Sequence, residues 1–324
     1  METKQTLEFS PEKMDFRAYS ISWNLTKRCN LNCDHCYLDA DFRGGLKNDE
    51  LSTEECFKVI DQIAEVNPNA FLILTGGEPL LRPDIYEIIR YAADRKFMVV
   101  LGTNGTMINR INAEKIKSAG AHGVGISIDS MNPDKHNKFR GVDKAWELSM
   151  DAFDILNEVG VDFLVQMSVS DMNYKEIPEV VEFTEKIGAI AFNLYFLVCT
   201  GRGQGNTDIS NAAYEEALKM LYEQQMKYKG KLMINSKCAP QYKRVVYEND
   251  PDSVYTRTYS GGCPAATHYS RISPEGNLTP CPFIEESVGN LKSRSFKDLW
   301  ENAPLMIQLR DRKQLDGKCG TCEF

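Results

Sequence analysis

The sequence predicts an α/β fold that forms a partial (β/α)6 barrel, and three observations support this prediction. Six short runs rich in apolar and β-branched residues alternate with longer segments whose apolar residues have helical spacing. The short runs are almost continuously apolar, as strands of a parallel sheet are when helices cover one face. The alternation ends at residues 199–208, which are rich in Gly, Thr and Asn. Because a closed TIM barrel needs eight units, we expect a partial, TIM-like barrel.

Each element follows from its own stretch of sequence. The six predicted strands span residues 19–25, 71–76, 97–103, 122–129, 163–169 and 190–198. The five predicted helices between them span residues 52–66, 83–95, 111–120, 144–160 and 176–188. Ser52 followed by Glu55 gives the first helix a capping box. Glycines stand where three of the helices should end, at Gly120, Gly160 and Gly188.

The pattern changes after the barrel. A helix is predicted at roughly 211–229, two short strands flank a turn at 273–277, and a short helix covers 295–302. We therefore divide the chain into a lead-in (1–17), the barrel (18–205), a connecting helix (206–230) and a cysteine-rich region (231–324).

Composition narrows the possible function. The 324 residues carry a formal net charge of -8, which disfavours nucleic-acid binding through a broad basic surface. No run is long enough to span a membrane, and the N-terminal segment has no secretory signal, so we expect a cytoplasmic protein without a membrane partner. In a reducing compartment, the ten cysteines indicate metal or redox chemistry rather than disulfides.

Three cysteines, Cys29, Cys33 and Cys36, directly follow the first predicted strand. Thiolates bind iron well, and four of them normally hold an iron–sulfur cluster, so three would leave one iron free to bind a small molecule. A zinc knuckle with a distant fourth ligand, or with His35, is the alternative, and coincidence is another. The motifs GGEP (76–79), GTNG (102–105) and SIDS (127–130) also follow strands. Since parallel strands end on one face, all four motifs should gather there.

Together, these motifs resemble the radical SAM superfamily over roughly residues 18–200. The resemblance implies that S-adenosylmethionine chelates the open iron of a 4Fe–4S cluster through its amino and carboxylate groups. It also implies reductive cleavage of this cosubstrate to a 5′-deoxyadenosyl radical, which abstracts hydrogen from a substrate C–H bond. A low-potential donor such as ferredoxin or flavodoxin would supply the electron. No further catalytic residue can be assigned from the sequence.

The resemblance also implies roles for single residues. Gly76, Gly77, Glu78 and Pro79 match the motif that contacts the methionine amino group. Paired glycines allow close backbone approach, and a glutamate can accept hydrogen bonds from an ammonium.

Residues from other strand ends match positions around the rest of the cosubstrate. Asp129 either matches a position that contacts the ribose and carboxylate or only caps its strand. Arg140 either matches an arginine near the carboxylate or is a solvated loop charge. The residues that match ribose and carboxylate contacts are Thr103, Asn104 and Ser127. The backbone of Tyr37 would meet the adenine.

The C-terminal cysteines resemble the SPASM extension of radical SAM enzymes, which holds one or two auxiliary iron–sulfur clusters. The matching ligands are Cys263, Cys281, Cys319 and Cys322, with Cys238 as an additional candidate that could instead be a free thiol. The pattern calls for further cysteines after Cys322, so we expect this extension to be cut short at Phe324. A zinc ribbon is the alternative.

Several stretches, among them 197–203, 238–245, 261–283 and 288–300, resemble the branch of this superfamily that modifies tetrapyrroles in haem and haem d1 biosynthesis. The resemblance implies a tetrapyrrole substrate, and Arg202 could pair with one of its carboxylates or bridge two domains. The alternative is a SPASM-type peptide maturase. Such enzymes often carry an N-terminal peptide-binding domain, and the first predicted strand here begins too early, at residue 19, to leave room for one.

Overall fold

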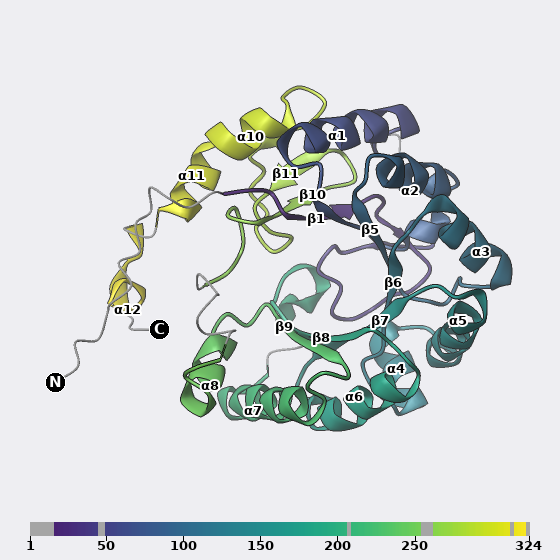
Figure 1. Cartoon of the computed structure of the whole chain (residues 1–324), viewed down its shortest axis with the longest axis vertical. Coiled ribbons are helices and arrows are strands. Elements are labelled where there is room, and N and C mark those ends of the chain that lie inside the picture. Colours follow the sequence, from purple (N-terminus) through teal and green to yellow (C-terminus); the bar gives the residue numbers. More distant parts are fainter. Residues whose placement is uncertain (1–15, 45–48, 206–208, 254–261, 312–313, 322–324) are drawn as a thin grey trace.

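The computed structural model describes residues 16–44, 49–205, 209–253, 262–311 and 314–321. In this part of the chain the main sheet has ten strands in the order β12-β11-β10-β1-β4-β5-β6-β7-β8-β9. The sheet curves into an inner arc of strands, and most of the helices form an outer arc around it (Figure 1). The predicted α/β fold is therefore confirmed.

All six predicted strands are present and lie side by side in parallel. They are β1 (Ser20–Asn24), β4 (Phe71–Thr75), β5 (Met98–Thr103), β6 (Gly123–Ser127), β7 (Phe163–Val169) and β8 (Ala191–Phe196). The five predicted helices are also present, as α1 (Thr53–Val66), α2 (Ile85–Asp94), α3 (Arg110–Ala119), α5 (Ala145–Val159) and α6 (Ile177–Lys186). The capping box of Ser52 and Glu55 forms as expected.

The parallel sheet extends further than the sequence indicated. The prediction that the βα alternation ends at residues 199–208 is wrong. The connecting helix α7 (Asn211–Lys227) is followed by β9 (Met233–Lys237), which pairs in parallel with β8. At the other end, β10 (Tyr269–Ile272) pairs in parallel with β1. The stretch of β9 was missed because it carries only two strongly apolar residues, too few to stand out as a buried strand.

The C-terminal part adds short strands to one end of this sheet, and its helix α10 contacts α1. The predicted hairpin consists of β10 and β11 (Asn277–Thr279), which pair antiparallel, and β12 (Gly289–Asn290) extends it. The predicted short helix is α10 (Phe296–Asn302). Helices not predicted from the sequence are α4 (Pro133–Arg140), α8 (Tyr242–Asn249), α11 (Pro304–Arg310) and α12 (Gly317–Gly320).

The two faces of the sheet differ in polarity. Side chains such as Trp23, Leu74 and Met167 are fully buried between the strands and the surrounding helices. The alternate positions face the inside of the arc and are mostly small or polar, for example Ser22 and Asn24. The apolar core therefore lies outside the arc, and the inner face is free for polar chemistry.

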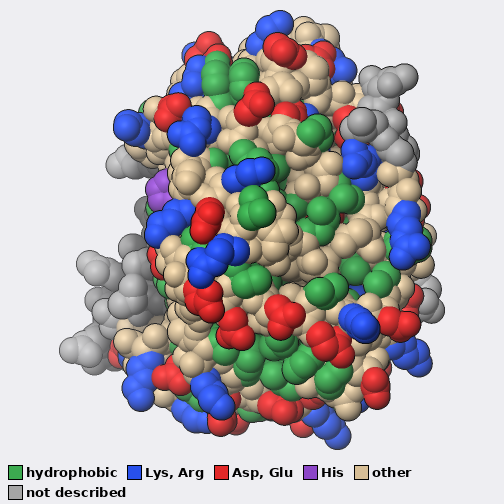
Figure 2. Space-filling view, turned by 90° about the vertical axis from the view of Figure 1, so that its right-hand side faces the viewer, with side chains coloured by type: hydrophobic (Ala, Val, Ile, Leu, Met, Phe, Trp, Pro, Cys, Tyr) green, Lys and Arg blue, Asp and Glu red, His purple; other side chains and the backbone are tan. Residues whose placement is uncertain are grey.

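The outer helices present a mixed surface. On the face that Figure 2 shows, acidic and basic side chains are interspersed with apolar ones. None of the helices in the described ranges is long and apolar enough to cross a membrane.

Candidate functional site

The three N-terminal cysteines lie in a loop, residues 25–43, that we call the cysteine loop. It follows β1, and its purple trace crosses the middle of the ring of strands (Figure 1). Within it, β2 (Arg28–Cys29) pairs in parallel with β3 (Asp41–Phe42). This short ladder gives the loop a backbone framework of its own.

The GGEP segment packs directly on the cysteine loop. The Gly77 amide donates to the Thr26 carbonyl and the Glu78 amide to the Arg28 carbonyl, both at 2.8 Å. A Cβ atom on Gly77 would stand 2.1 Å from the Arg28 carbonyl oxygen, and one on Gly76 2.5 Å from that of Thr26. The glycines thus permit close backbone approach, as the sequence suggested, and the backbone they approach is that of the cysteine loop.

Arg202 holds the cysteine loop from the opposite side. This residue lies in the 3-10 helix η4 (Gly201–Gly205). Its Nε donates to the Cys33 carbonyl at 3.1 Å, its Nη1 to the Ala40 carbonyl at 2.8 Å, and Nη1 also pairs with Asp39 at 3.0 Å. The two roles considered from the sequence, binding a substrate carboxylate and bridging domains, are therefore not what the structure shows. The guanidinium ties the backbone at the second cysteine to the residues that follow the third, Asp39 and Ala40.

Helix α4 supports the loop between Cys29 and Cys36. The Asn32 amide donates to the Arg140 carbonyl at 3.1 Å, and the Asp34 amide to the Phe139 carbonyl at 3.2 Å. The His35 ring stacks on Phe139 with 4.0 Å between ring centroids, and burial lowers the pKa of His35 to about 3. A buried, stacked imidazole is poorly placed to serve as a fourth metal ligand.

Hydrogen-bond donors approach each of the three sulfur atoms. Cys29 Sγ accepts from the Leu31 amide and Cys36 Sγ from the Ala40 amide, both at 3.4 Å, and Arg140 Nη1 lies 3.9 Å from Cys33 Sγ. Burial raises the pKa of Cys29 to about 12. Burial also raises the pKa of Cys33, although the positive charge of Arg140 acts to lower it. Buried thiols of this kind lose their protons when a metal ion binds to their sulfur atoms.

The donor set fits an iron–sulfur cluster. Three thiols with N–H donors on their sulfurs are the surroundings that such clusters have in proteins. In the described ranges, no three His, Cys, Asp or Glu side chains converge closely enough to hold a single metal ion.

Glu78 joins the GGEP segment to the end of β5. Its carboxylate is fully buried and accepts from the Leu80 amide at 3.0 Å, the Asn104 amide at 2.9 Å and the Thr103 hydroxyl at 2.8 Å. Burial raises the pKa of Glu78 to about 7, against the effect of these hydrogen bonds. The carboxylate therefore fixes Thr103 and Asn104 relative to the GGEP segment.

Asn104 links the GTNG motif to the cysteine loop. Its Nδ2 donates to Asn30 Oδ1 at 2.8 Å, and Asn30 Nδ2 donates to the Thr106 hydroxyl at 2.8 Å. Three of the motifs predicted to gather at one face, namely the cysteines, GGEP and GTNG, are thus joined by direct hydrogen bonds.

Arg140 and Asp129 form a buried ion pair beside the loop. Arg140 Nη2 lies 2.6 Å from Asp129 Oδ2, and both side chains are almost fully buried. Asp129 Oδ1 also accepts from the Ser168 amide at 2.9 Å, so the carboxylate connects the ends of β6 and β7. The alternative that Arg140 is a solvated loop charge is wrong, because its side chain is buried in α4 and paired with Asp129. Ser127 lies at the end of β6 and is partly exposed.

Tyr37 connects the cysteine loop to the strands at the end of the sheet. Its hydroxyl accepts from Asn24 Nδ2 at 2.8 Å, and Asn24 Oδ1 accepts from Arg271 Nε. Its ring lies edge-on to Phe283, two residues after Cys281. The loop and the C-terminal cysteine-rich region therefore meet at Tyr37.

Three of the C-terminal cysteines come from separate segments and lie within electrostatic reach of one another. Cys238 follows β9, Cys263 precedes β10 and Cys281 follows β11. The pKa of Cys238 is raised, first by the protein atoms around its sulfur and then by the charges of Cys281 and Cys263. Cys238 also adopts a left-handed backbone conformation with φ of 60°, which is strained for a non-glycine residue. Cys319 lies in α12 without a described side chain, and Cys322 lies outside the described residues.

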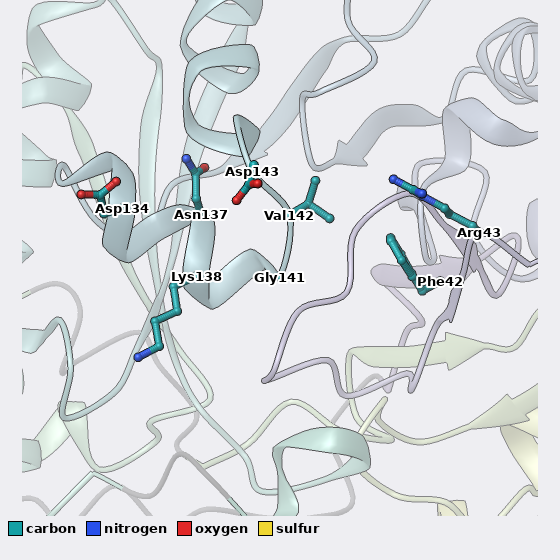
Figure 3. A pocket seen from close by; sticks show the side chains of 8 residues that line it. All are labelled: Phe42, Arg43, Asp134, Asn137, Lys138, Gly141, Val142 and Asp143. Carbon is teal, nitrogen blue, oxygen red and sulfur yellow. The ribbon is translucent and has the colours of Figure 1, made fainter.

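A cavity of about 680 Å³ lies beside the cysteine loop, between β3 and the α4–α5 connection (Figure 3). Among its lining side chains, Arg43 and Lys138 are basic, and Asp134 and Asp143 are acidic. None of the residues predicted to bind the cosubstrate or a metal lines it, so this cavity is distinct from the motif site.

Comparison with known proteins matches two family models to this chain. Residues 23–184 match the radical SAM superfamily, and residues 263–323 match the SPASM iron–sulfur cluster-binding domain. The "AdoMet-dependent heme synthase" of Methanosarcina barkeri is 37% identical, over 94% of this chain and 88% of the relative. The "Fe-coproporphyrin III synthase" of the same organism is 29% identical, over 98% of this chain and 83% of the relative.

A solved structure shows the same fold. The crystal structure of Streptococcus suis SuiB bound to S-adenosylmethionine superimposes with a TM-score of 0.77 at 17% identity, covering 95% of this chain and 71% of that protein.

Proposed function

The chain belongs to the radical SAM superfamily and is a radical SAM enzyme with a SPASM domain, and on this premise we propose that its substrate is a tetrapyrrole. The superfamily and the SPASM domain imply a 4Fe–4S cluster, S-adenosylmethionine and additional iron–sulfur clusters. When bound, the open-site cluster and S-adenosylmethionine supply a 5′-deoxyadenosyl radical that takes hydrogen from a C–H bond. The protein's part is to hold these groups, orient the substrate and exclude water.

We propose that Cys29, Cys33 and Cys36 bind the open-site cluster. The support is the framework around them, in which GGEP, α4 and Arg202 contact the cysteine loop from different directions. The amide donors on Cys29 and Cys36 would stabilise thiolate ligands. A loop fixed in this way holds its three sulfurs in place before any cluster arrives.

The cosubstrate would bind at the strand ends next to this loop. Its proposed contacts are the GGEP residues Gly76, Gly77, Glu78 and Pro79, then Thr103, Asn104, Ser127, Asp129 and Arg140, with the Tyr37 backbone at the adenine. The hydrogen bonds that Glu78 accepts from Thr103 and Asn104 support this, because they connect two of the proposed contact segments rigidly.

For the auxiliary clusters, we propose Cys238, Cys263, Cys281, Cys319 and Cys322 as ligands. The mutual influence of the first three thiols supports a shared site. The strained backbone at Cys238 is in keeping with a ligand rather than a free thiol. The division of the chain into a barrel and a separate cysteine-rich region stays a prediction.

The tetrapyrrole assignment rests on one observation, the 37% identity with a haem synthase across nearly the whole chain. To test it, anaerobically reconstituted protein is incubated with S-adenosylmethionine, a chemical reductant and either iron-coproporphyrin III or a sirohaem-derived tetrapyrrole. We expect 5′-deoxyadenosine to form together with a changed tetrapyrrole mass. Inertness toward both, with turnover of a peptide encoded nearby, would establish the alternative, a peptide maturase.

The electron for cosubstrate cleavage has to come from another protein in the cell. We propose a low-potential donor such as ferredoxin or flavodoxin, because a single electron at low potential is needed. Replacing the chemical reductant with reduced flavodoxin should support 5′-deoxyadenosine formation, and a system that works only with dithionite would contradict this.

A further inference from the structure

The inner face of the sheet carries very few charges. The parallel strands β1, β4 to β9 and β10, all within the described residues, contain no Asp or Glu. Their only charged residues are Lys237 and Arg271. Both are cationic, and they occur in β9 and β10, the first and last of the parallel strands across the sheet.

Both cations lie on the inner face. Arg271 is in register with Ser22 and donates through Nε to Asn24, two inward-facing residues of β1. Lys237 is in register with Tyr195 of β8, and two residues earlier in each strand Asn235 donates to Asn193. In a pair of parallel strands, two residues in register lie on the same face of the sheet, and so do two residues that are two positions apart along one strand.

Tyr195, near one end of the sheet, and Tyr269, near the other, both lie on this inner face. The pKa of Tyr269 in β10 is raised, first by burial and further by the nearby hydroxyls of Tyr37 and Tyr195. Tyr195 stands next to Lys237, and Tyr269 stands two residues before Arg271 on the same face. The two cations therefore flank one region, next to the Tyr37 end of the cysteine loop.

Neither cation has a carboxylate partner within ion-pair distance among the described residues. Tyr37, Glu275 and Cys281 act on Arg271 from farther away, and Cys238 acts on its neighbour Lys237. Arg271 uses only Nε in a hydrogen bond with Asn24, and both side chains are partly buried. Elsewhere, the buried arginines of the barrel are paired, Arg82 with Asp84 and Arg140 with Asp129. A partly buried cation that lacks a directly paired carboxylate is less favourable than a paired one, so it favours binding of a carboxylate from outside.

We propose that Arg271 and Lys237 bind peripheral carboxylates of the tetrapyrrole substrate on the inner face of the barrel, one from each end of the sheet. The inference rests on the tetrapyrrole substrate proposed above. Coproporphyrin-type tetrapyrroles carry carboxylates around the rim of an otherwise apolar macrocycle. Two cations on separate strands would hold two of these groups, and the arginine fork would fix the orientation of one. The tyrosines between them offer flat apolar surface to the macrocycle.

The test is a binding measurement on the reconstituted full chain. Absorbance titration with iron-coproporphyrin III gives Kd for the wild type and for Arg271→Gln, Lys237→Gln and the double variant. We expect each single substitution to weaken binding roughly tenfold and the double variant to weaken it further. Gln at position 271 can still donate to Asn24, so the link to Tyr37 is retained.

Matched controls separate charge from other effects. Lys186→Gln in α6 and Arg110→Gln in α3 remove the same charges from exposed outer helices and should leave Kd unchanged. Arg271→Lys keeps the charge and should retain most of the affinity. The tetramethyl ester of the same iron porphyrin, which lacks the carboxylates, should bind the wild type and the variants alike.

The two proposals fail in different ways. If the wild type binds iron-coproporphyrin III and the variants bind it equally tightly, the carboxylate site is wrong and the proposed substrate stands. If the variants lose the ester and the acid to the same extent, the residues support the fold and do not bind carboxylates. If the wild type binds no tetrapyrrole, the proposed function fails, and the inference fails with it.

Discussion

The two cysteine sites of this chain are built in opposite ways. Cys29, Cys33 and Cys36 lie within eight consecutive residues, and neighbouring segments hold their loop through backbone hydrogen bonds. Cys238, Cys263 and Cys281 come from three segments, and the residues at Cys238 and Cys263 are exposed. The first site is formed by local sequence and then braced, whereas the second exists only once distant segments have folded together. The two sites should therefore respond differently to substitution.

The largest expected effect comes from removing ligands. Replacing Cys29, Cys33 and Cys36 with Ala should abolish formation of 5′-deoxyadenosine, because the cluster that delivers the electron would be lost. Cys281→Ala should lower the iron content while some cleavage of S-adenosylmethionine remains. Cys199→Ser, an exposed cysteine outside both sites, serves as the control for loss of a thiol. Retained cleavage in the triple variant would refute the assignment of the first site.

The second test concerns the bracing of the cysteine loop. In Gly77→Ala the new Cβ would meet the Arg28 carbonyl at 2.1 Å, so the GGEP segment or the loop has to move. We expect a loss of about 3 kcal/mol or more in the free energy of unfolding, and loss of cosubstrate cleavage. Thermal unfolding and 5′-deoxyadenosine formation measure the two effects.

Gly230→Ala is the matched control for that test. Gly230, unlike Gly77, has a positive φ, of 80°, and a Cβ atom added to it would meet nothing within 4 Å. Only the left-handed conformation is penalised there, by about 1 kcal/mol. Equal losses in the two variants would show that the close packing of GGEP on the loop is unimportant.

The third test uses pH, since the first site has a buried carboxylate at its edge. The pKa of Glu78 is raised from 4.5 to about 7, so the folded chain binds more protons than the unfolded chain between these values. Stability should therefore fall as pH rises through this window, on the order of 3 kcal/mol relative to Glu78→Gln, which has no titrating group. Denaturant unfolding of both proteins between pH 5 and 8 would measure this (roughly the range in which Glu titrates here). Parallel stability curves would contradict it.

The smallest effect is expected at Arg202. Arg202→Lys keeps the charge but loses the fork that joins the Cys33 and Ala40 carbonyls, so the loop should loosen by about 1–2 kcal/mol. The cluster at the first site should then lose iron to a chelator several-fold faster. The auxiliary site, which Arg202 does not contact, should lose iron at an unchanged rate, and equal acceleration at both sites would contradict the assignment.

The sequence alone determined the elements whose signals are local. Strands β1 and β4 to β8, helices α1, α2, α3, α5 and α6, and the capping box of Ser52 all follow from periodicity and capping over short windows. The positions of the motifs at strand ends follow from parallel topology. The radical SAM class was predictable because its cysteines and its strand-end motifs are short and contiguous.

Only the tertiary structure decided which groups meet. Helix α4 was missed because its sequence, PDKHNKFR, is mostly polar and has a single strongly apolar residue, and its role is to support the cysteine loop from outside. Strand β9 has little apolar signal, and β10 was recognised as a strand without its parallel pairing to β1.

The roles of three cations depended on the fold in the same way. Arg202 binds the cysteine loop, whereas Arg271 and Lys237 lie on the inner face of the barrel. The residues next to them in the sequence do not distinguish a cation that binds the loop from one that lies on the inner face. Short stretches of sequence determine secondary-structure propensity and motif chemistry. The partner of a charged side chain, in contrast, is set by segments up to hundreds of residues away. Asn24 and Arg271 are 247 positions apart and share a hydrogen bond, a pairing that the parallel alignment of β1 with β10 creates.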